Sequence, residues 1–273
     1  MTHQEPPSPD TILKVENLVK EYPTKRVLDG VTFYANRGEV LVVMGGSGAG
    51  KSTIFNCIIG ATPATSGNIW IAGTDITTLK NERAYEAIRQ KYGVAFQSGA
   101  LFNSMTIGDN VALPLRYHTE LDEDTIKVIV KIKLEQVGLR DAESLLPAQI
   151  SGGMQKRAAF ARAMALDPKI VFFDEPSAGL DPITISVIDE LINDFSKKMG
   201  ITCVVITHEL TSAFRIADRM IMLHQGKIIR EGTPEEMKNS EDPLVHQFIN
   251  GNPDGPIPRS MSHKDYYDDI LEI

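Results

Sequence analysis

The sequence is poor in cysteine and contains no long apolar run. Its 273 residues include only two cysteines, Cys57 and Cys203, too few and too scattered for a disulfide scaffold or a cysteine metal cluster. Each lies in an apolar stretch, so we expect small buried side chains in a reducing compartment. No apolar run approaches the roughly 20 residues that span a bilayer. If this protein works at a membrane, another chain must provide the spans.

Positive charge is also scarce. There are 28 Lys and Arg residues against 36 Asp and Glu, a net charge of −8 with no dense basic cluster, which argues against a nucleic-acid partner. Residues 1–10 lack the apolar core of a signal peptide and are expected to form a flexible tail. Hydrophobic content of 42% is ordinary for a soluble globular protein, and the length allows one large domain with a subdomain.

Short β-branched runs alternate with helical patterns, which predicts a mostly parallel sheet flanked by helices. The expected strands are residues 13–19, 31–34, 40–44, 68–71, 93–96, 170–173, 202–206 and 220–223, with a short hairpin strand after 226. Helices are expected at 51–59, 106–115, 122–137, 153–166, 234–238 and 244–251. Residues 11–97 and 166–250 would form an α/β core, 98–165 an inserted helical subdomain and 251–273 a C-terminal extension.

A glycine-rich loop follows the apolar strand at 40–44 and precedes a helix. Its residues fit the phosphate-binding pattern G-x-x-x-x-G-K-[ST]: Gly45, Gly46, Ser47, Gly48, Ala49, Gly50, Lys51, Ser52, followed by Thr53. The glycines allow successive amides to face phosphate, and the helix adds its positive end. Lys51 would reach the β- and γ-phosphates, and Ser52 would ligate Mg²⁺. A flexible turn with an incidental lysine is the weaker alternative in this context.

Two carboxylates end another apolar strand, at residues 170–173. Asp174 and Glu175 would lie at the carboxyl edge of the sheet, where open α/β sheets bind ligands. We expect Asp174 to hold Mg²⁺ and Glu175 to polarise the water that attacks the γ-phosphate. The alternative is a solvated acidic turn.

Two neutral polar residues also follow strands. Gln97 could contact Mg²⁺ or the attacking water, or it could be an ordinary loop residue. His208 could stabilise transferring charge through its N–H, or it could be a polar turn residue.

Further candidates are residues at helix starts and in a loop. Ser151, Gly152 and Gly153 offer a hydroxyl and open amides at a second helix start, although a plain N-cap is equally consistent. Asp181 precedes Pro182 as an N-cap would, which is compatible with an active-site loop. Tyr22 could stack on adenine or be a surface aromatic.

In this order the motifs resemble the ATP-binding cassettes of ABC transporters over residues 11–250. The matching positions are the phosphate loop, the glutamine lid at Gln97, the signature from Ile150 to Met154, the carboxylate strand, the D-loop at 177–182, the switch histidine His208 and the aromatic Tyr22. The resemblance implies an α/β P-loop NTPase (RecA-like) core with an inserted helical subdomain, and hydrolysis of ATP with Mg²⁺. Ile150 and Met154 depart from the usual Leu and Gln, but neither replaces a residue expected to meet phosphate.

Three segments are similar to the ATPases of Mce-type phospholipid transporters of the Mla kind: residues 96–102, 151–157 and the C-terminal end from Gly251. This resemblance implies a homodimer at the cytoplasmic face of the inner membrane. Its partners would be an integral-membrane permease (MlaE-like), an Mce lipid-binding protein (MlaD-like) and a small STAS-domain protein (MlaB-like). The aromatic segment from Tyr266 to Ile273 would dock on the second ATPase, unless it is a solvated tail.

Other classes remain open. A P-loop small-molecule kinase would share the phosphate loop but needs neither Ser151 nor His208. A soluble ABC protein acting on ribosomes or DNA normally carries two cassettes or a coiled-coil insertion, and this chain has neither. An ATPase of a different ABC importer or exporter is the nearest alternative.

Overall fold

The computed structural model describes residues 10–257. The tail expected before residue 10 and the docking segment from Tyr266 to Ile273 lie outside the described residues.

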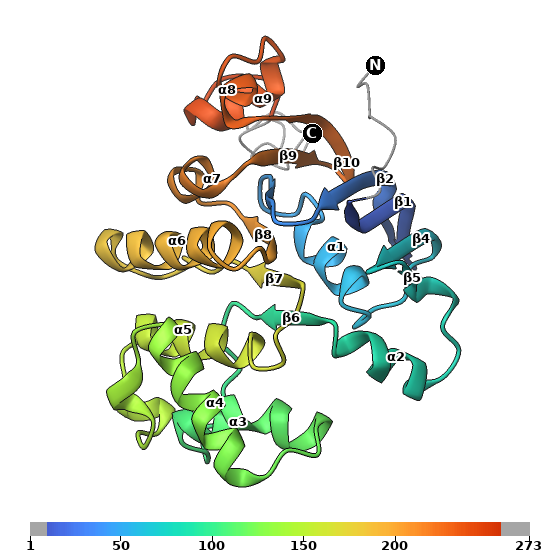
Figure 1. The fold of residues 1–273 in the computed structure, drawn as a ribbon. Helices are drawn as coiled ribbons and strands as arrows, with labels where there is room; N and C mark the ends of the chain where they lie inside the picture. Colours follow the sequence, from blue (N-terminus) through green and yellow to red (C-terminus); the bar gives the residue numbers. More distant parts are fainter. Residues whose placement is uncertain (1–9, 258–273) are drawn as a thin grey trace, which may run out of the picture.

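A six-stranded sheet forms the centre of the molecule, with the order β10-β9-β3-β8-β7-β6 (Figure 1). Its strands are β3 (Val40–Met44), β6 (Tyr92–Ala95), β7 (Ile170–Asp174), β8 (Thr202–Thr207), β9 (Arg219–His224) and β10 (Lys227–Gly232). All neighbouring pairs are parallel except β9 with β10. Every residue of β3 and β8 is buried, as expected for strands covered on both faces.

The remaining strands form a second, antiparallel sheet with the order β2-β1-β4-β5. They are β1 (Thr11–Tyr22), β2 (Lys25–Asn36), β4 (Ser66–Ile71) and β5 (Thr74–Asp75). The sequence patterns alone had suggested one mostly parallel sheet. Only Pro23 and Thr24 connect β1 to β2, and a connection this short permits only an antiparallel hairpin.

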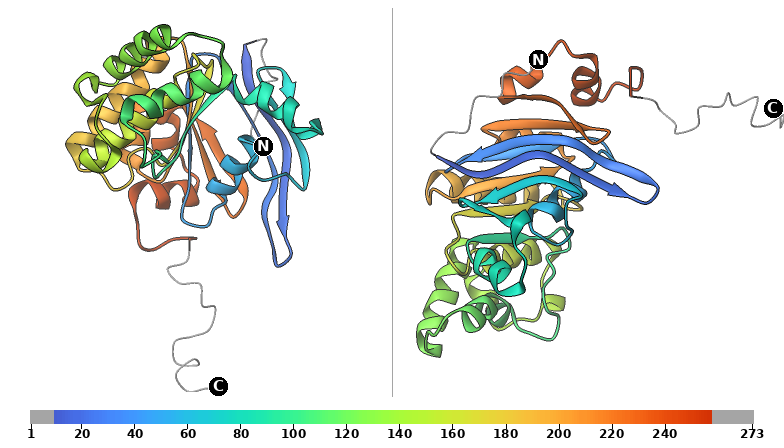
Figure 2. Two further views of the ribbon diagram at one scale, coloured as in Figure 1. Left: turned by 90° about the horizontal axis from the view of Figure 1, so that it is seen from below. Right: turned by 90° about the vertical axis from the view of Figure 1, so that its right-hand side faces the viewer.

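The helices cover the central sheet on both faces and extend beyond its β6 edge. They are α1 (Lys51–Ile58), α2 (Glu82–Arg89), α3 (Ile107–His118), α4 (Glu123–Gln136), α5 (Gly152–Ala163), α6 (Pro182–Lys197), α7 (Leu210–Ile216), α8 (Pro234–Lys238) and α9 (Pro243–Asn250). Short 3₁₀ turns span Ile76–Thr78, Arg140–Ala142 and Pro147–Gln149. Helices α3, α4 and α5, which we call the helical lobe, project away from the sheets in Figure 1 and in the right view of Figure 2.

Alternating residues of the central strands divide the core into two layers. Leu41 and Val43 of β3 pack with α1 and the antiparallel sheet. Val40 and Val42 face the opposite layer, which contains α6, α7 and the helical lobe. This alternation follows from the two-residue period of a strand. Within residues 10–257, no helix combines the length and apolar character that crossing a bilayer requires.

Candidate functional site

The carboxyl ends of four neighbouring parallel strands meet at one edge of the central sheet. Met44 of β3 is level with Thr207 of β8, and Ile206 of β8 is level with Asp174 of β7. Ala95 of β6 is level with Phe173 of β7. The residues that follow these strands, including Gly45, Gln97, Glu175 and His208, therefore share this edge, where α/β sheets bind ligands.

The phosphate loop connects β3 to α1 as expected. Gly50 immediately precedes the helix with φ of 110°, a conformation that disfavours side chains, and no side chain caps the helix start. Within residues 10–257, the amides of Ser47, Gly48 and Gly50 donate no hydrogen bond to protein atoms. Free amides at a helix N-terminus form an anion-binding site.

Gly45 is required for steric reasons that do not depend on a ligand. A Cβ atom at this position would lie 2.3 Å from the carbonyl oxygen of Leu223 in β9, whereas one at Gly46 would meet nothing within 4 Å. Gly45→Ala is therefore expected to lower the nucleotide-free stability by about 1–3 kcal/mol, a typical cost of overpacking. Each kcal/mol should lower Tm by about 2–4 °C. Gly46→Ala is the matched control and should melt within a degree or so of wild type, and equal melting of the two variants would contradict the steric argument.

Lys51 lies over its own loop. Its ammonium donates hydrogen bonds to the carbonyls of Gly45 (2.7 Å) and Gly46 (3.0 Å). Burial lowers the pKa of Lys51, and the carboxylates of Glu175 and Asp174 oppose that shift. The three charges therefore act within one site.

The oxygen donors expected for Mg²⁺ also lie on this edge. Gln97 and Asp174 line one open groove of about 540 Å³ together with Ser98, Ala178 and Gly179. Burial first, and then the charge of Glu175, raise the pKa of Asp174. Among the described residues, no group of three or more His, Cys, Asp or Glu side chains could hold a metal. A hydroxyl at Ser52 and one carboxylate would suit Mg²⁺ together with nucleotide oxygens, since this ion is usually bound by few protein ligands plus phosphate.

Glu175 is held in a strained and well-defined position. Its φ of 46° lies in the left-handed region, which is uncommon for a residue with a side chain. The carboxylate accepts hydrogen bonds from Thr207 Oγ1 (3.1 Å) and the His208 amide (3.2 Å). His208 Nδ1 lies 2.8 Å from the other carboxylate oxygen. The structure thus pairs the two residues whose catalytic roles were predicted separately.

The second helix start is built as an N-cap, the alternative that the sequence left open beside phosphate binding. Ser151 Oγ accepts a hydrogen bond from the Met154 amide at 3.3 Å, and Gly152 is exposed. A Cβ atom at Gly153 would lie 2.4 Å from Thr184 Cγ2 in the first turn of α6. Asp181 caps that turn, accepting from the amides of Ile183 (3.0 Å) and Thr184 (3.1 Å), so its predicted N-cap role is confirmed. The signature residues and the D-loop therefore lie together.

The signature and the phosphate loop of one chain lie on different parts of the molecule. The loop follows β3, and α5 packs against β6, with β8 and β7 between those two strands. The signature lies beside Thr184 in the first turn of α6, and Lys156, one turn further along α5, bonds to the carbonyl of Glu175 after β7.

Tyr22 is the last residue of β1 and not a loop residue, which corrects the expectation from the sequence. It pairs with Lys25 at the tip of the β1–β2 hairpin and is 45% exposed. The same hairpin reaches the phosphate loop through Leu28, whose Cδ2 would lie 2.8 Å from a Cβ atom at Gly50. The hairpin thus extends from the loop to an accessible aromatic ring.

Three residues that hold this site belong to none of the positions predicted from the sequence. Thr207 supports Glu175, as described above. Arg162 of α5 donates to the carbonyls of Gly99 (2.9 Å) and Ala100 (2.8 Å) in the loop after Gln97. Lys156, also on α5, donates to the carbonyls of Gln97 and Glu175. Lys156 and Arg162 stand out in the sequence as long charged residues in α5, a helix rich in small residues. Their partners, however, lie 19 to 63 positions away along the chain, so the sequence does not reveal them.

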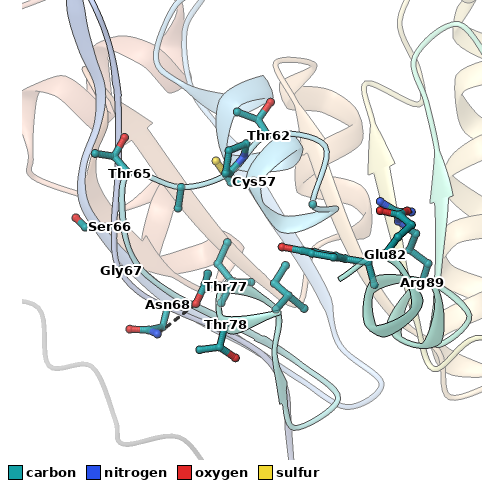
Figure 3. Close-up of a pocket in the computed structure, with 16 residues that line it drawn as sticks. Cys57, Thr62, Thr65, Ser66, Gly67, Asn68, Thr77, Thr78, Glu82 and Arg89 are labelled. Carbon is teal, nitrogen blue, oxygen red and sulfur yellow. Dashed lines mark hydrogen bonds and ion pairs between the residues drawn. The ribbon is translucent and has the colours of Figure 1, made fainter. Parts of the chain in front are cut away.

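A separate cavity of about 490 Å³ lies between α1, β4 and α2, and Figure 3 shows its lining. Several of its polar side chains already have partners: Asn68 donates to Thr77 (3.3 Å) and to Asp75 outside the lining (3.0 Å), and Arg89 pairs with Glu82. Asp174, Glu175 and the phosphate loop are not part of this lining. The predicted chemistry therefore belongs to the open sheet edge.

Comparison with known proteins agrees with this geometry. A match to the family described as ABC transporter covers residues 28–178, from β2 through the carboxylate strand to the D-loop. The chain belongs to the ABC transporter family. The predicted family and α/β P-loop fold are confirmed.

Similar proteins include two curated ATP-binding subunits. The chain is 40% identical to the intermembrane phospholipid transport system ATP-binding protein MlaF of Haemophilus influenzae, over 96% of this chain and 98% of that protein. It is 42% identical to the probable ribonucleotide transport ATP-binding protein mkl of Mycobacterium leprae, over 91% of this chain and 71% of that protein.

Solved structures extend the agreement to the fold. A dimeric ATP-binding cassette in a post-hydrolysis state with ADP and Pi bound is similar with a TM-score of 0.75 and 30% identity. The likeness covers 81% of this chain and 98% of that one. An ABC ATPase related to this chain thus forms a dimer with nucleotide bound.

Proposed function

We propose that this chain is the ATP-hydrolysing subunit of an ABC transporter complex that moves phospholipid between the inner and outer membranes and so maintains outer-membrane lipid asymmetry. The observation that carries the choice of cargo is the extent of the likeness to MlaF. The family match ends at residue 178, whereas 40% identity to MlaF spans 96% of this chain and 98% of that protein. The relative named for ribonucleotide transport is matched over only 71% of its length.

Binding of ATP falls to the phosphate loop and to Tyr22. The free amides before α1 would cradle the phosphates, Lys51 would turn from its own loop carbonyls toward the β- and γ-phosphates, and Tyr22 would stack on adenine. Ser52 and Asp174 would hold Mg²⁺, with Gln97 beside them. When bound, the ion neutralises charge on the phosphate oxygens.

Hydrolysis needs a base and a stabiliser of charge. Glu175 would accept the proton of the attacking water, and its carboxylate is already oriented by Thr207 and the His208 amide. The imidazole of His208, exposed on one side and bonded to Glu175 on the other, would stabilise charge on the γ-phosphate.

A second copy would complete the site. The phosphate loop follows β3 and the signature opens α5 in the helical lobe, and a related cassette is a dimer with nucleotide bound, so Ser151 and Gly152 of one copy would cover the nucleotide of the other. Two such sites form in a head-to-tail dimer that is stable only while the γ-phosphate is present. We propose that the dimer lies at the cytoplasmic face of the inner membrane with the permease, Mce and STAS-domain partners implied by the resemblance.

Affinity purification from native membranes tests the assembly and the cargo. We expect a tagged chain to recover an integral-membrane partner and bound phospholipid, identified by mass spectrometry. Added phospholipid should stimulate the ATPase of the complex, and added ribonucleoside monophosphates should not. A complex with the Lys51→Met variant controls for contaminating ATPases. Recovery without any integral-membrane protein, or stimulation by ribonucleotides alone, would contradict the proposal.

A further inference from the structure

A buried lysine joins three functional segments of the described chain. Lys156 lies on α5, one turn after the signature glycines, and is only 8% exposed. Its ammonium donates one hydrogen bond to the carbonyl of Gln97 and another, of 3.2 Å, to the carbonyl of Glu175. One side chain thereby connects the signature helix, the glutamine loop and the residue that follows the carboxylate strand.

Burying an ammonium is costly unless hydrogen bonds and opposite charge compensate it. Burial lowers the pKa of Lys156, and the carboxylates of Asp174 and Glu175 oppose the shift. Packing alone would be satisfied by an apolar side chain. The charge instead serves the two main-chain carbonyls that it binds. By bonding to both, Lys156 fixes the distance between the loop at Gln97 and the loop at Glu175.

The same helix holds the glutamine loop at further points. Arg162 donates to the carbonyls of Gly99 and Ala100, so α5 contacts the loop at Gln97, Gly99 and Ala100. Any displacement of α5 is therefore transmitted to this loop. Arg162 bonds to the glutamine loop, whereas Lys156 bonds both to this loop and to Glu175.

We propose that Lys156 is a positioning residue that couples the signature helix to Gln97 and Glu175. The inference rests on the proposed ATPase function. When Ser151 and Gly152 bind the nucleotide of a second copy, any shift of α5 moves Lys156 and, through its two hydrogen bonds, the backbone at Gln97 and Glu175. Closure then sets the place of the base and of the glutamine relative to the γ-phosphate. Lys156 acts through main-chain atoms and touches no phosphate.

The test replaces Lys156 by Met, which keeps an unbranched stem but removes the charge and all donors. The carbonyls of Gln97 and Glu175 then lose a charged donor. We expect kcat to fall at least tenfold, as for loss of a charged hydrogen bond. The KM for ATP should stay within about threefold, because the phosphate loop is unchanged. Hydrogen exchange at the Gly99 amide, which bonds to the Phe96 carbonyl at 2.9 Å, should accelerate.

Lys133→Met is the matched control. Lys133 is another buried lysine of the helical lobe, 5% exposed, and its ammonium bonds to Asp167 at 2.5 Å. This variant should lose thermal stability while keeping kcat within about twofold and leaving exchange at Gly99 unchanged. If Lys156→Met does not fold, Lys156→Gln serves as the second variant. Its shorter, neutral amide cannot replace both bonds, so we expect the same fall in kcat with little change in KM.

Equal kcat values in the Lys156 and Lys133 variants would overturn the positioning role. A rise in KM matching the fall in kcat/KM would also overturn it, since it would indicate a part in nucleotide binding. Wild-type protein without ATPase activity is a different result, because it refutes the proposed function itself.

Discussion

Glu175→Gln is expected to bind ATP and Mg²⁺ normally and to hydrolyse ATP at about one hundredth of the wild-type rate or less, since a general base contributes 10²–10⁴-fold. The substitution preserves the size of the side chain and its carbonyl acceptor. It removes the group that can take a proton from water. Steady-state turnover and equilibrium binding of ATP to the same preparation separate the two effects.

The surroundings of Glu175 strengthen this expectation. Thr207, the His208 amide and the His208 ring fix both carboxylate oxygens, and the backbone at Glu175 is held at a φ of 46°. Strain of this kind persists where the surrounding structure over-determines it, often at functional sites. Nearby Glu209, which caps α7 through the Thr211 amide, is the matched control. Glu209→Gln should keep turnover within about twofold, and near-normal turnover of Glu175→Gln would remove Glu175 as the base.

Sequence periodicity was sufficient for most of the central sheet. The run from Val40 to Met44 is apolar throughout and is β3, and the apolar run before Asp174 is β7. Each of the eight predicted strands overlaps an observed one. Strands β3 and β7 are buried on both faces along nearly their whole length, so their composition alone identifies them.

The sequence did not predict which strands share a sheet, and it did not predict helix α2. The strands β1, β2 and β4 alternate like other strands, and the short β1–β2 connection becomes visible only once the full lengths of the two strands are known. Helix α2 is short and mostly polar and buries only Ile88 of its eight residues, so little in the sequence distinguishes it from a polar connection. Both features depend on packing between distant segments.

In the candidate site, too, some residues could be predicted from the sequence and others only from the fold. Glycine, lysine and carboxylate positions follow strands and are visible as motifs, because their chemistry requires particular residues at particular spacings. Lys156 and Thr207 act on atoms 19 or more positions away, so only the fold assigns them partners. Motifs thus identify groups that would meet the nucleotide, and the structure identifies those that hold them in place.

Mixing two inactive variants is expected to restore ATPase activity. Lys51→Met removes the phosphate-binding ammonium, and Gly152→Glu places a negative charge where the second copy's γ-phosphate would lie. Each homodimer should fall to about one hundredth of wild-type activity or less, since either change removes charge stabilisation. A mixed dimer carries both defects in one composite site and neither in the other. Equal mixing makes half of the dimers mixed, so about a quarter of all sites are intact.

The choice of Gly152 makes the result specific to the shared site. A Cβ atom there meets nothing within 4 Å, and Gly152 is the first residue of α5, where a carboxylate stabilises a helix. The variant should therefore fold at least as stably as wild type, and Gly152→Gln separates the charge from the added bulk. The measurement is turnover of co-refolded or co-expressed pairs against each variant alone. If the mixture stays at the activity of the single variants, the result contradicts two shared sites that hydrolyse ATP independently. Recovery near a quarter of wild-type activity excludes a site built within one chain.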